Sequence, residues 1–233
     1  EITILANVWP TLKSKKNQTI ISWVDESFTH GCLAIDPSGR VFAQLGNTTI
    51  LNLTPISLHK WYHVWVSIDL KKQYASCGWC SISERIKKIH TVKDNIHLNS
   101  TSKVMFKKII IAASYDKKPH SYFNGKIEDP CIYNISSFDN QRPNLAKNKC
   151  IANWDFSQEI SSTNIIDHGP YKLNGTLINF PARAMTGSNW NGSSMDWQYK
   201  SDQYGAIHFH EDDLYDCEWE TDFSYKIPKN LKS

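Results

Sequence analysis

Short apolar runs recur along the chain at close spacing, and Gly, Pro, Asn or Asp residues bound each run. This pattern is typical of β-strands joined by tight turns. The clearest runs of the first half lie at 20–23, 32–36, 40–45, 61–69, 108–113 and 127–134. Between the second and third runs, Pro37-Ser38-Gly39 predicts a β-hairpin, because Pro presets φ and Gly tolerates the turn. The sequence therefore predicts an all-β fold.

The run at 61–69 carries bulky side chains on both of its faces. Because successive strand residues point to opposite sides, Trp61, His63 and Trp65 share one face. Tyr62 and Val64 lie on the other face. Apolar bulk on both sides predicts a central strand of a β-sandwich.

A polar segment divides the chain. We expect a β-sandwich over residues 1–136 and a linker over 137–150, where Ser, Asn, Asp, Pro and Lys interrupt the apolar alternation. Residues 151–233 again show strand-like runs, separated by a loop-like stretch at 185–204. We interpret them as a partial second β region. We also expect both ends of the chain to continue into a longer polypeptide.

Composition and charge narrow the class of protein. The 233 residues are 40% hydrophobic and 12% aromatic, which is enough apolar material for a sizeable core. The formal charge is +3, and the basic residues are scattered in short pairs, so we expect no nucleic-acid partner. No apolar run is long enough to span a bilayer and no signal peptide is visible, so we expect a cytoplasmic protein without membrane contacts.

One short motif has the residue types of a metal site. His208 and His210 stand two apart in a strand-like run and therefore share a face, with Asp212 just beyond. Imidazole and carboxylate groups in this arrangement suit a divalent metal, although the sequence shows no further ligands. The alternative is a strand that ends in an acidic turn whose side chains cap backbone groups.

A second motif, Cys77-Gly78-Trp79-Cys80, has the spacing of a redox pair. Redox pairs lie at strand-to-helix turns, whereas the flanking sequence here is hairpin-like, which favours incidental thiols. Asn-X-Ser/Thr sequons also occur, and they would carry glycans only if the protein is secreted. The sequons are at Asn17, Asn47, Asn52, Asn99, Asn134, Asn174 and Asn191.

Exposed aromatic side chains are a third candidate feature. Trp190, Trp197 and Tyr199 fall in a stretch rich in Gly, Ser and Asn. They would offer stacking faces to a sugar or a partner protein, or would anchor the irregular segment to the core. Both interpretations stay open at this point.

Two resemblances cover most of the chain. The order of elements to residue 134 resembles a laminin-G-like or concanavalin-like lectin domain, a jelly-roll sandwich, most clearly at 19–23, 61–64 and 122–129. Residues 179–190 and 206–216 resemble the large (beta) subunit of bacterial N,N-dimethylformamidase and its homologues.

The second resemblance implies a hydrolase of linear amide C–N bonds. In that family a mononuclear iron, held by two tyrosines and a glutamate, acts as a Lewis acid in a domain that would lie beyond Ser233. We therefore expect no catalytic residue in this chain, and we assign no iron ligand to Tyr204, Glu211 or Tyr215. The partner implied is the rest of the large subunit, while a small accessory subunit and homo-oligomer contacts are left open.

Three functions follow in order of preference. The first is the non-catalytic β region of an amide hydrolase. The second is a lectin-like module that binds a carbohydrate or a protein, without enzymatic activity. The third is a metal enzyme built on His208 and His210.

Overall fold

The chain folds into β-strands joined by turns. A computed structural model describes residues 1–25, 30–85, 88–96, 106–116, 118–135 and 149–211, together with residues 224 and 226. No helix in those ranges is long and apolar enough to cross a membrane. The strands of the first half are β1 (Ile2–Pro10), β2 (Gln18–Asp25), β3 (His30–Ile35), β4 (Arg40–Leu45), β5 (Thr48–Pro55), β6 (Tyr62–Asp69), β7 (Tyr74–Ser81), β8 (Ile89–Asn95), β9 (Phe106–Ile111), β10 (Ser114–Tyr115), β11 (Pro119–His120) and β12 (Gly125–Tyr133). Those of the second half are β13 (Cys150–Asp155), β14 (Asn164–Asp167), β15 (Gly175–Thr176), β16 (Ala182–Met185) and β17 (Ala206–Phe209), with a 3₁₀ turn at Ser201–Gln203.

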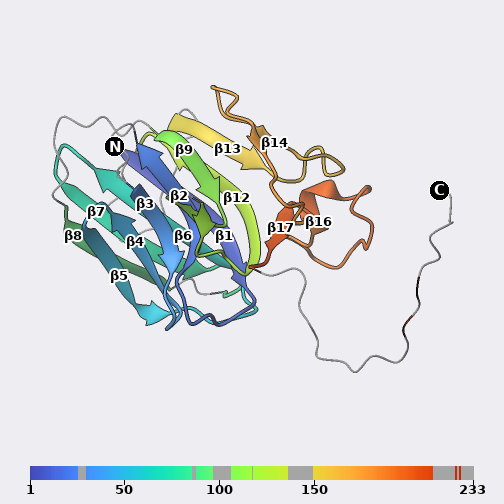
Figure 1. Cartoon of the computed structure of the whole chain (residues 1–233), viewed down its shortest axis with the longest axis horizontal. Helices are drawn as coiled ribbons and strands as arrows, with labels where there is room; N and C mark the ends of the chain where they lie inside the picture. Colours follow the sequence, from blue (N-terminus) through green and yellow to red (C-terminus); the bar gives the residue numbers. More distant parts are fainter. Residues whose placement is uncertain are drawn as a thin grey trace.

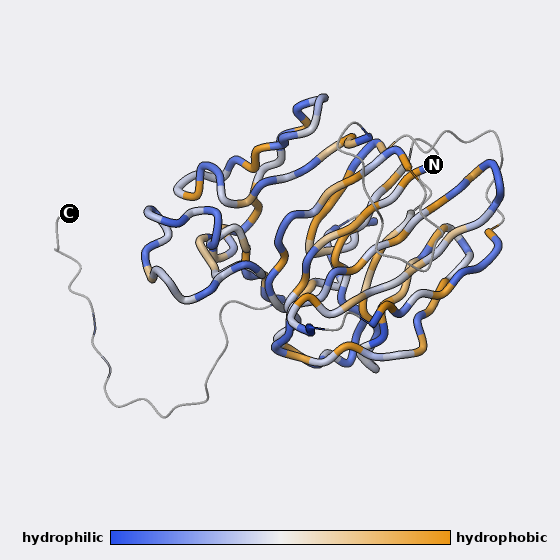
Figure 2. The backbone as a smooth tube through the Cα atoms, turned by 180° about the vertical axis from the view of Figure 1, so that it is seen from behind, coloured by the Kyte–Doolittle hydropathy of each residue, from blue (hydrophilic) through white to orange (hydrophobic). Residues whose placement is uncertain are grey.

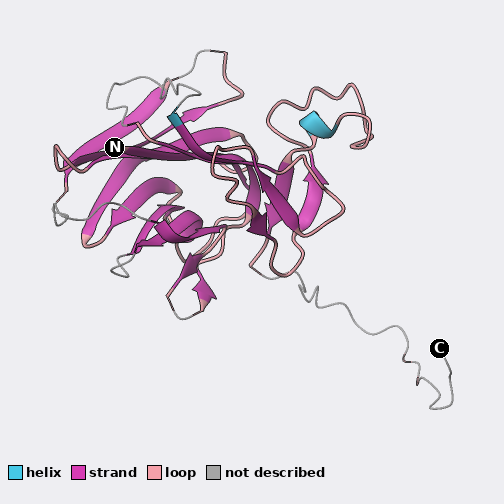
Figure 3. Ribbon diagram, turned by 90° about the horizontal axis from the view of Figure 1, so that it is seen from above, coloured by secondary structure: helices cyan, strands magenta, loops and turns pink. Residues whose placement is uncertain are grey.

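Two antiparallel sheets face each other (Figures 1 and 3). The larger sheet has the strand order β15-β14-β13-β12-β1-β6-β7-β8, with β17 pairing to β12 and β16. The smaller sheet has the order β5-β4-β3-β2-β9. This arrangement confirms the predicted all-β sandwich.

The main core lies between the sheets, where the hydrophobic positions of the strands converge (Figure 2). Ile4, Ala6 and Val8 of β1 are fully buried there, as the period of two requires. The predicted hairpin joins β3 to β4. Its turn is fixed by Asp36, whose carboxylate accepts from the backbone N–H of Ser38 at 2.9 Å and from the Arg40 side chain at 2.8 Å.

The outer face of the larger sheet is also packed. Leu5, Trp65, Cys80 and Cys131 form a second buried cluster there, and Trp65 is only 2% exposed. The Trp65 ring lies against Gly78 of the neighbouring strand, at a position where a side chain would collide with it. The prediction of a central strand with bulk on both faces is therefore confirmed.

The strands beyond the predicted linker extend the same large sheet. β13 and β17 both pair with β12, and Trp154, Phe156 and Ile207 belong to the main core. Most of the linker, residues 137–148, lies outside the described residues. The division of the chain into two domains stays a prediction, and the described strands after the linker belong to the same large sheet as β12.

Candidate functional site

A cleft of about 590 Å³ opens on the outer face of the larger sheet. Strands β1, β6, β12 and β13 supply its floor, and the segments after β13 and β14 supply its rim. The described residues that line it include carboxylates, imidazoles and amides, but neither Lys nor Arg. They are Leu5, Asn7, His63, Glu128, Asp129, Cys131, Tyr133, Asn153, Asp155, Ser157, His168, Asp202 and Gly205.

A β-bulge in β12 places two neighbouring carboxylates in this cleft. The pairing with β1 shifts between Leu5 and Asn7, so two residues of β12 oppose one of β1. Asp129 takes a left-handed backbone conformation with φ of 48°. Bulges redirect side chains in this way, and both Glu128 and Asp129 consequently line the cleft. Pro130 inside the strand is the signal in the sequence for this bulge.

Glu128 binds a loop that comes from the C-terminal part of the chain. It is buried, and its carboxylate accepts from the backbone N–H of Ser188 at 3.0 and 3.1 Å. Asn7 donates to it from Nδ2 at 3.2 Å, and the side-chain oxygen Oδ1 of Asn7 lies 2.9 Å from Nδ1 of His63. A Cβ at position 187 would overlap the Glu128 carboxylate, so a larger residue there would displace Glu128. Glu128 therefore fixes the loop.

Asp129 has an unusual affinity for a proton. Desolvation within the cleft, with the negative charges of Glu128 and Asp155 adding to it, raises the pKa of Asp129 to about 7. Asp129 is nonetheless an exposed residue, so water screens part of this effect. A carboxyl group that titrates near neutral pH is able to donate or accept a proton in the cleft.

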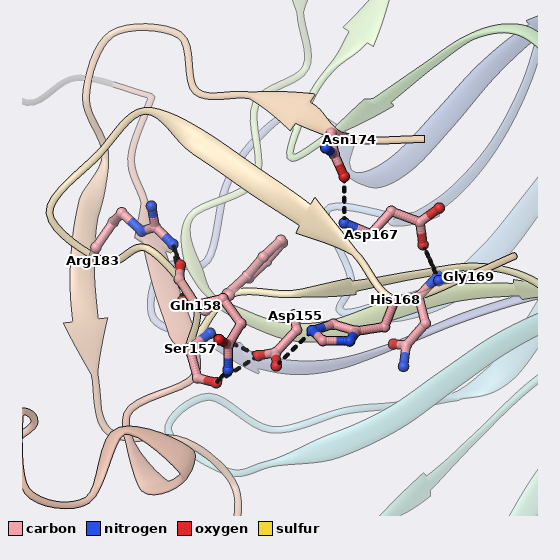
Figure 4. Close-up of polar contacts among 10 residues, drawn as sticks. Asp155, Ser157, Gln158, Asp167, His168, Gly169, Asn174 and Arg183 are labelled. Carbon is pink, nitrogen blue, oxygen red and sulfur yellow. Dashed lines mark hydrogen bonds and ion pairs between the residues drawn. The ribbon is translucent and has the colours of Figure 1, made fainter. Parts of the chain in front are cut away.

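Asp155 links the rim to the floor (Figure 4). One of its oxygens accepts from the backbone N–H of Ser157 at 2.9 Å and from the Ser157 hydroxyl at 2.6 Å. The other lies 3.5 Å from Nε2 of His168, a half-exposed side chain. Because the hydroxyl donates to the carboxylate rather than to the imidazole, this is not the arrangement that activates a serine nucleophile.

Asp167 fixes the loop that carries His168. It is fully buried, and its carboxylate accepts from the backbone N–H groups of Gly169 and Leu173, each at 2.7 Å. Its own N–H donates to the Asn174 side chain at 2.9 Å (Figure 4). A carboxylate with several backbone donors orders a loop without regular secondary structure. The position of His168 at the rim is thereby set.

Arg183 has a similar role on the other side of the segment that follows β13 (Figure 4). Its guanidinium donates to five backbone carbonyl groups at 2.7–3.1 Å. Desolvation lowers the pKa of Arg183, although Glu159 and Asp155 oppose that change. The carbonyl groups belong to Phe156, Gln158, Glu159, Ser162 and Asn164.

The histidine pair predicted from the sequence lies outside this cleft. His208 and His210 do share a face, with ring centroids 3.9 Å apart. Asp212 lies outside the described residues. Within the described part of the chain, no group of three or more His, Cys, Asp or Glu side chains is placed to hold a metal ion. Metal binding by the pair stays a prediction.

The predicted aromatic residues do not line the cleft either. Trp190 donates from Nε1 to the Ser194 carbonyl at 3.2 Å and is 38% exposed. Trp197 is half-buried, and Tyr199 is 78% exposed. The Trp190 bond lies within its own loop and Tyr199 projects into solvent, so stacking on a ligand and anchoring to the core both stay predictions.

The two cysteines with redox spacing lie on opposite faces of β7. Cys77 belongs to the main core and Cys80 to the outer cluster. Burial raises the pKa of the Cys77 thiol strongly, which is the reverse of a redox cysteine. Both thiols lie within a β-strand, and this placement favours incidental thiols.

Two known proteins are similar in sequence to nearly the whole of this chain. The chain is 28% identical over 261 residues to a protein of an Alcaligenes species, and 27% identical over 257 residues to one of Paracoccus aminophilus. Each match covers 97% of this chain. Both are N,N-dimethylformamidase beta subunits. The resemblance predicted from the sequence is therefore confirmed.

This chain spans about a third, 34%, of the length of those relatives. No family model matches it. The similarity consequently concerns one part of the dimethylformamidase beta subunit.

Solved structures were also compared with this chain. A candidate carbohydrate-binding protein from Bacteroides ovatus has a TM-score of 0.53 at 16% identity, over 75% of this chain and 51% of that one. The CBM40 module of a Ruminococcus gnavus IT-sialidase, bound to α2,3-sialyllactose, has a TM-score of 0.48 at 15% identity, over 60% and 78%. The first likeness supports the lectin-type β-sandwich, and the laminin-G family itself stays a prediction.

Proposed function

We propose that this chain is the non-catalytic β region of the large subunit of a hydrolase that acts on linear amide C–N bonds. The observation that carries the proposal is the similarity to two dimethylformamidase beta subunits across 97% of the chain. A short motif would match only locally, whereas this similarity follows the whole sandwich and its C-terminal extension.

We assign no iron ligand to the described residues. The Tyr204 hydroxyl donates to the Ser194 carbonyl at 2.9 Å, while Glu211 lies 3.5 Å from the Lys16 ammonium. These two side chains are thus engaged with separate partners, and Tyr215 lies outside the described residues. We place the iron in the part of the parent subunit that this chain does not include. The rest of that subunit is the proposed partner, together with a small accessory subunit and further copies of the parent.

The test is an assay of the full-length parent protein on dimethylformamide and other small linear amides, with iron supplied. We expect turnover by the parent, loss of turnover after iron is removed, and none by this chain alone. If the iron-loaded parent hydrolysed no linear amide, the proposal would be rejected.

A second candidate is a carbohydrate-binding module, and the polar cleft is the observation that favours it. Asn153, Asp155 and Ser157 offer the amide, carboxylate and hydroxyl groups that bind sugar hydroxyls. A glycan array with this chain separates the two functions. Selective binding that is lost in Asn153→Ala and kept in Trp197→Ala would favour a site in the cleft. The reverse result would favour the exposed aromatic residues.

A further inference from the structure

Large apolar side chains are exposed mainly in one part of the molecule. Among the described residues, seven of the ten exposed large hydrophobic side chains lie between residues 171 and 199. Figures 1 and 2 place this segment at one end of the molecule, beyond β12. We call these seven residues the apolar end. They are Tyr171, Leu173, Ile178, Phe180, Trp190, Met195 and Tyr199.

The backbone beneath the apolar end is firmly held. The buried Trp154 donates from Nε1 to the Leu173 carbonyl at 2.7 Å, and the Tyr204 hydroxyl donates to the Ser194 carbonyl at 2.9 Å. Asp167 and Arg183 add their several backbone contacts on either side. Polar groups therefore fix this segment, while its large apolar side chains face solvent. Large exposed apolar patches on soluble proteins mark interaction sites.

Phe180 is an exposed side chain on a strained backbone. It is 80% exposed, and its φ of 47° is left-handed, a conformation that is costly for a bulky residue. Such strain persists where the surrounding structure enforces it, commonly at functional positions. Burial within the described part of this chain does not offset the cost. A surface that covers Phe180 would offset it.

The curated relatives indicate what that surface is. This chain spans 34% of their length, so about two thirds of each relative lies beyond the matched region. We propose that the apolar end is the surface on which this remaining part of the parent large subunit docks. The inference rests on the proposed function, and it adds the face by which the β region is joined to the rest of the subunit.

The experiment compares oxidation of Met195 in this chain and in the full-length parent. Met195 is 82% exposed and oxidises according to its access to peroxide, whereas the half-buried Met185 serves as an internal reference. Relative to Met185, we expect oxidation of Met195 at least about tenfold slower in the parent than in this chain. Equal relative rates in the two proteins would overturn the proposal.

Other occupants give different results. If Met195 is already protected in dilute samples of this chain, its own C-terminal residues cover the surface and the proposal is wrong. If protection in the parent disappears on dilution, a second copy or another subunit covers it, and the proposal is again wrong. The measurement needs no catalysis. A parent that shows protection without amide hydrolysis would therefore refute the proposed function and leave the docking surface standing.

A matched pair of variants tests the surface directly. Leu53 of β5 is 76% exposed, and Figure 1 shows β5 at the opposite end of the molecule. In the parent, we expect Phe180→Asp to return Met195 to the oxidation rate of this chain, and Leu53→Asp to leave its protection unchanged. If both substitutions have the same effect, or Phe180→Asp has none, the apolar end is not the docking surface.

Discussion

Replacement of Arg183 by alanine tests whether one side chain holds the segment that follows β13. Two of its five hydrogen bonds, to Phe156 and Ser162, are partly buried, and the other three are exposed. A carbonyl left without a donor in a partly buried site costs roughly 1–2 kcal/mol, whereas an exposed carbonyl is rehydrated. We therefore expect Arg183→Ala to lower the free energy of unfolding by about 2–4 kcal/mol.

Urea unfolding of this chain measures the effect, with the exposed Arg85→Ala as the matched control. Arg183→Lys keeps the positive charge but loses the planar fork of donors, so we expect it to lie between the wild type and alanine. The m-value should not change. If the free energies of unfolding of Arg183→Ala and Arg85→Ala differed by less than about 0.5 kcal/mol, the Arg183 hydrogen bonds would not stabilise the fold and the reasoning would fail.

Three further expectations concern single residues. Gly187→Ala should lower the free energy of unfolding by about 1–3 kcal/mol because its Cβ would meet Glu128, whereas Gly205→Ala, which has room, should change it little. Asp129→Asn should raise the thermal midpoint at pH 8 but not at pH 4. The folded-state pKa of Asp129, about 7, exceeds the unfolded-state pKa. Ionisation of Asp129 therefore destabilises the fold as the pH rises from the unfolded-state pKa to the folded-state pKa. A larger gain at pH 4 would contradict this. Cys77 should resist thiol reagents at pH 8 until urea unfolds the protein, and rapid labelling of the folded protein would show that the core position is wrong.

The elements that depend on local pattern were predictable from the sequence. The run at 61–69 forms β6 over Tyr62–Asp69, since alternation with bulk on both faces leaves few alternatives to a central strand. The hairpin at 37–39 follows from local turn chemistry. Asp36, Gly39 and Arg40 suffice to close it.

The cleft was not predictable, because its residues meet only through long-range pairing. Asn7, Glu128 and Ser188 are joined although they lie up to 181 residues apart. Pro130 marks the bulge that turns Asp129 into the cleft, but a proline in a strand does not say which residues lie opposite. The role of Arg183 was equally hidden, since its partners are backbone carbonyl groups, which carry no sequence signal.

The structure brings together the two stretches that resemble the dimethylformamidase beta subunit. Lys126 and Glu128 stand on the outer face of β12, and their charged groups bind the loop at 186–188: the Lys126 ammonium donates to the Thr186 hydroxyl at 2.7 Å, and Glu128 accepts from Ser188. β17 pairs with the same strand. Residues 179–190 and 206–211 thus meet on β12, and packing of the C-terminal extension onto the sandwich accounts for their sequence pattern. Packing within the described residues does not account for Phe180 or Met195, which lie in or beside those stretches and face solvent. Contact with the rest of a larger subunit, as proposed above, would bury both side chains.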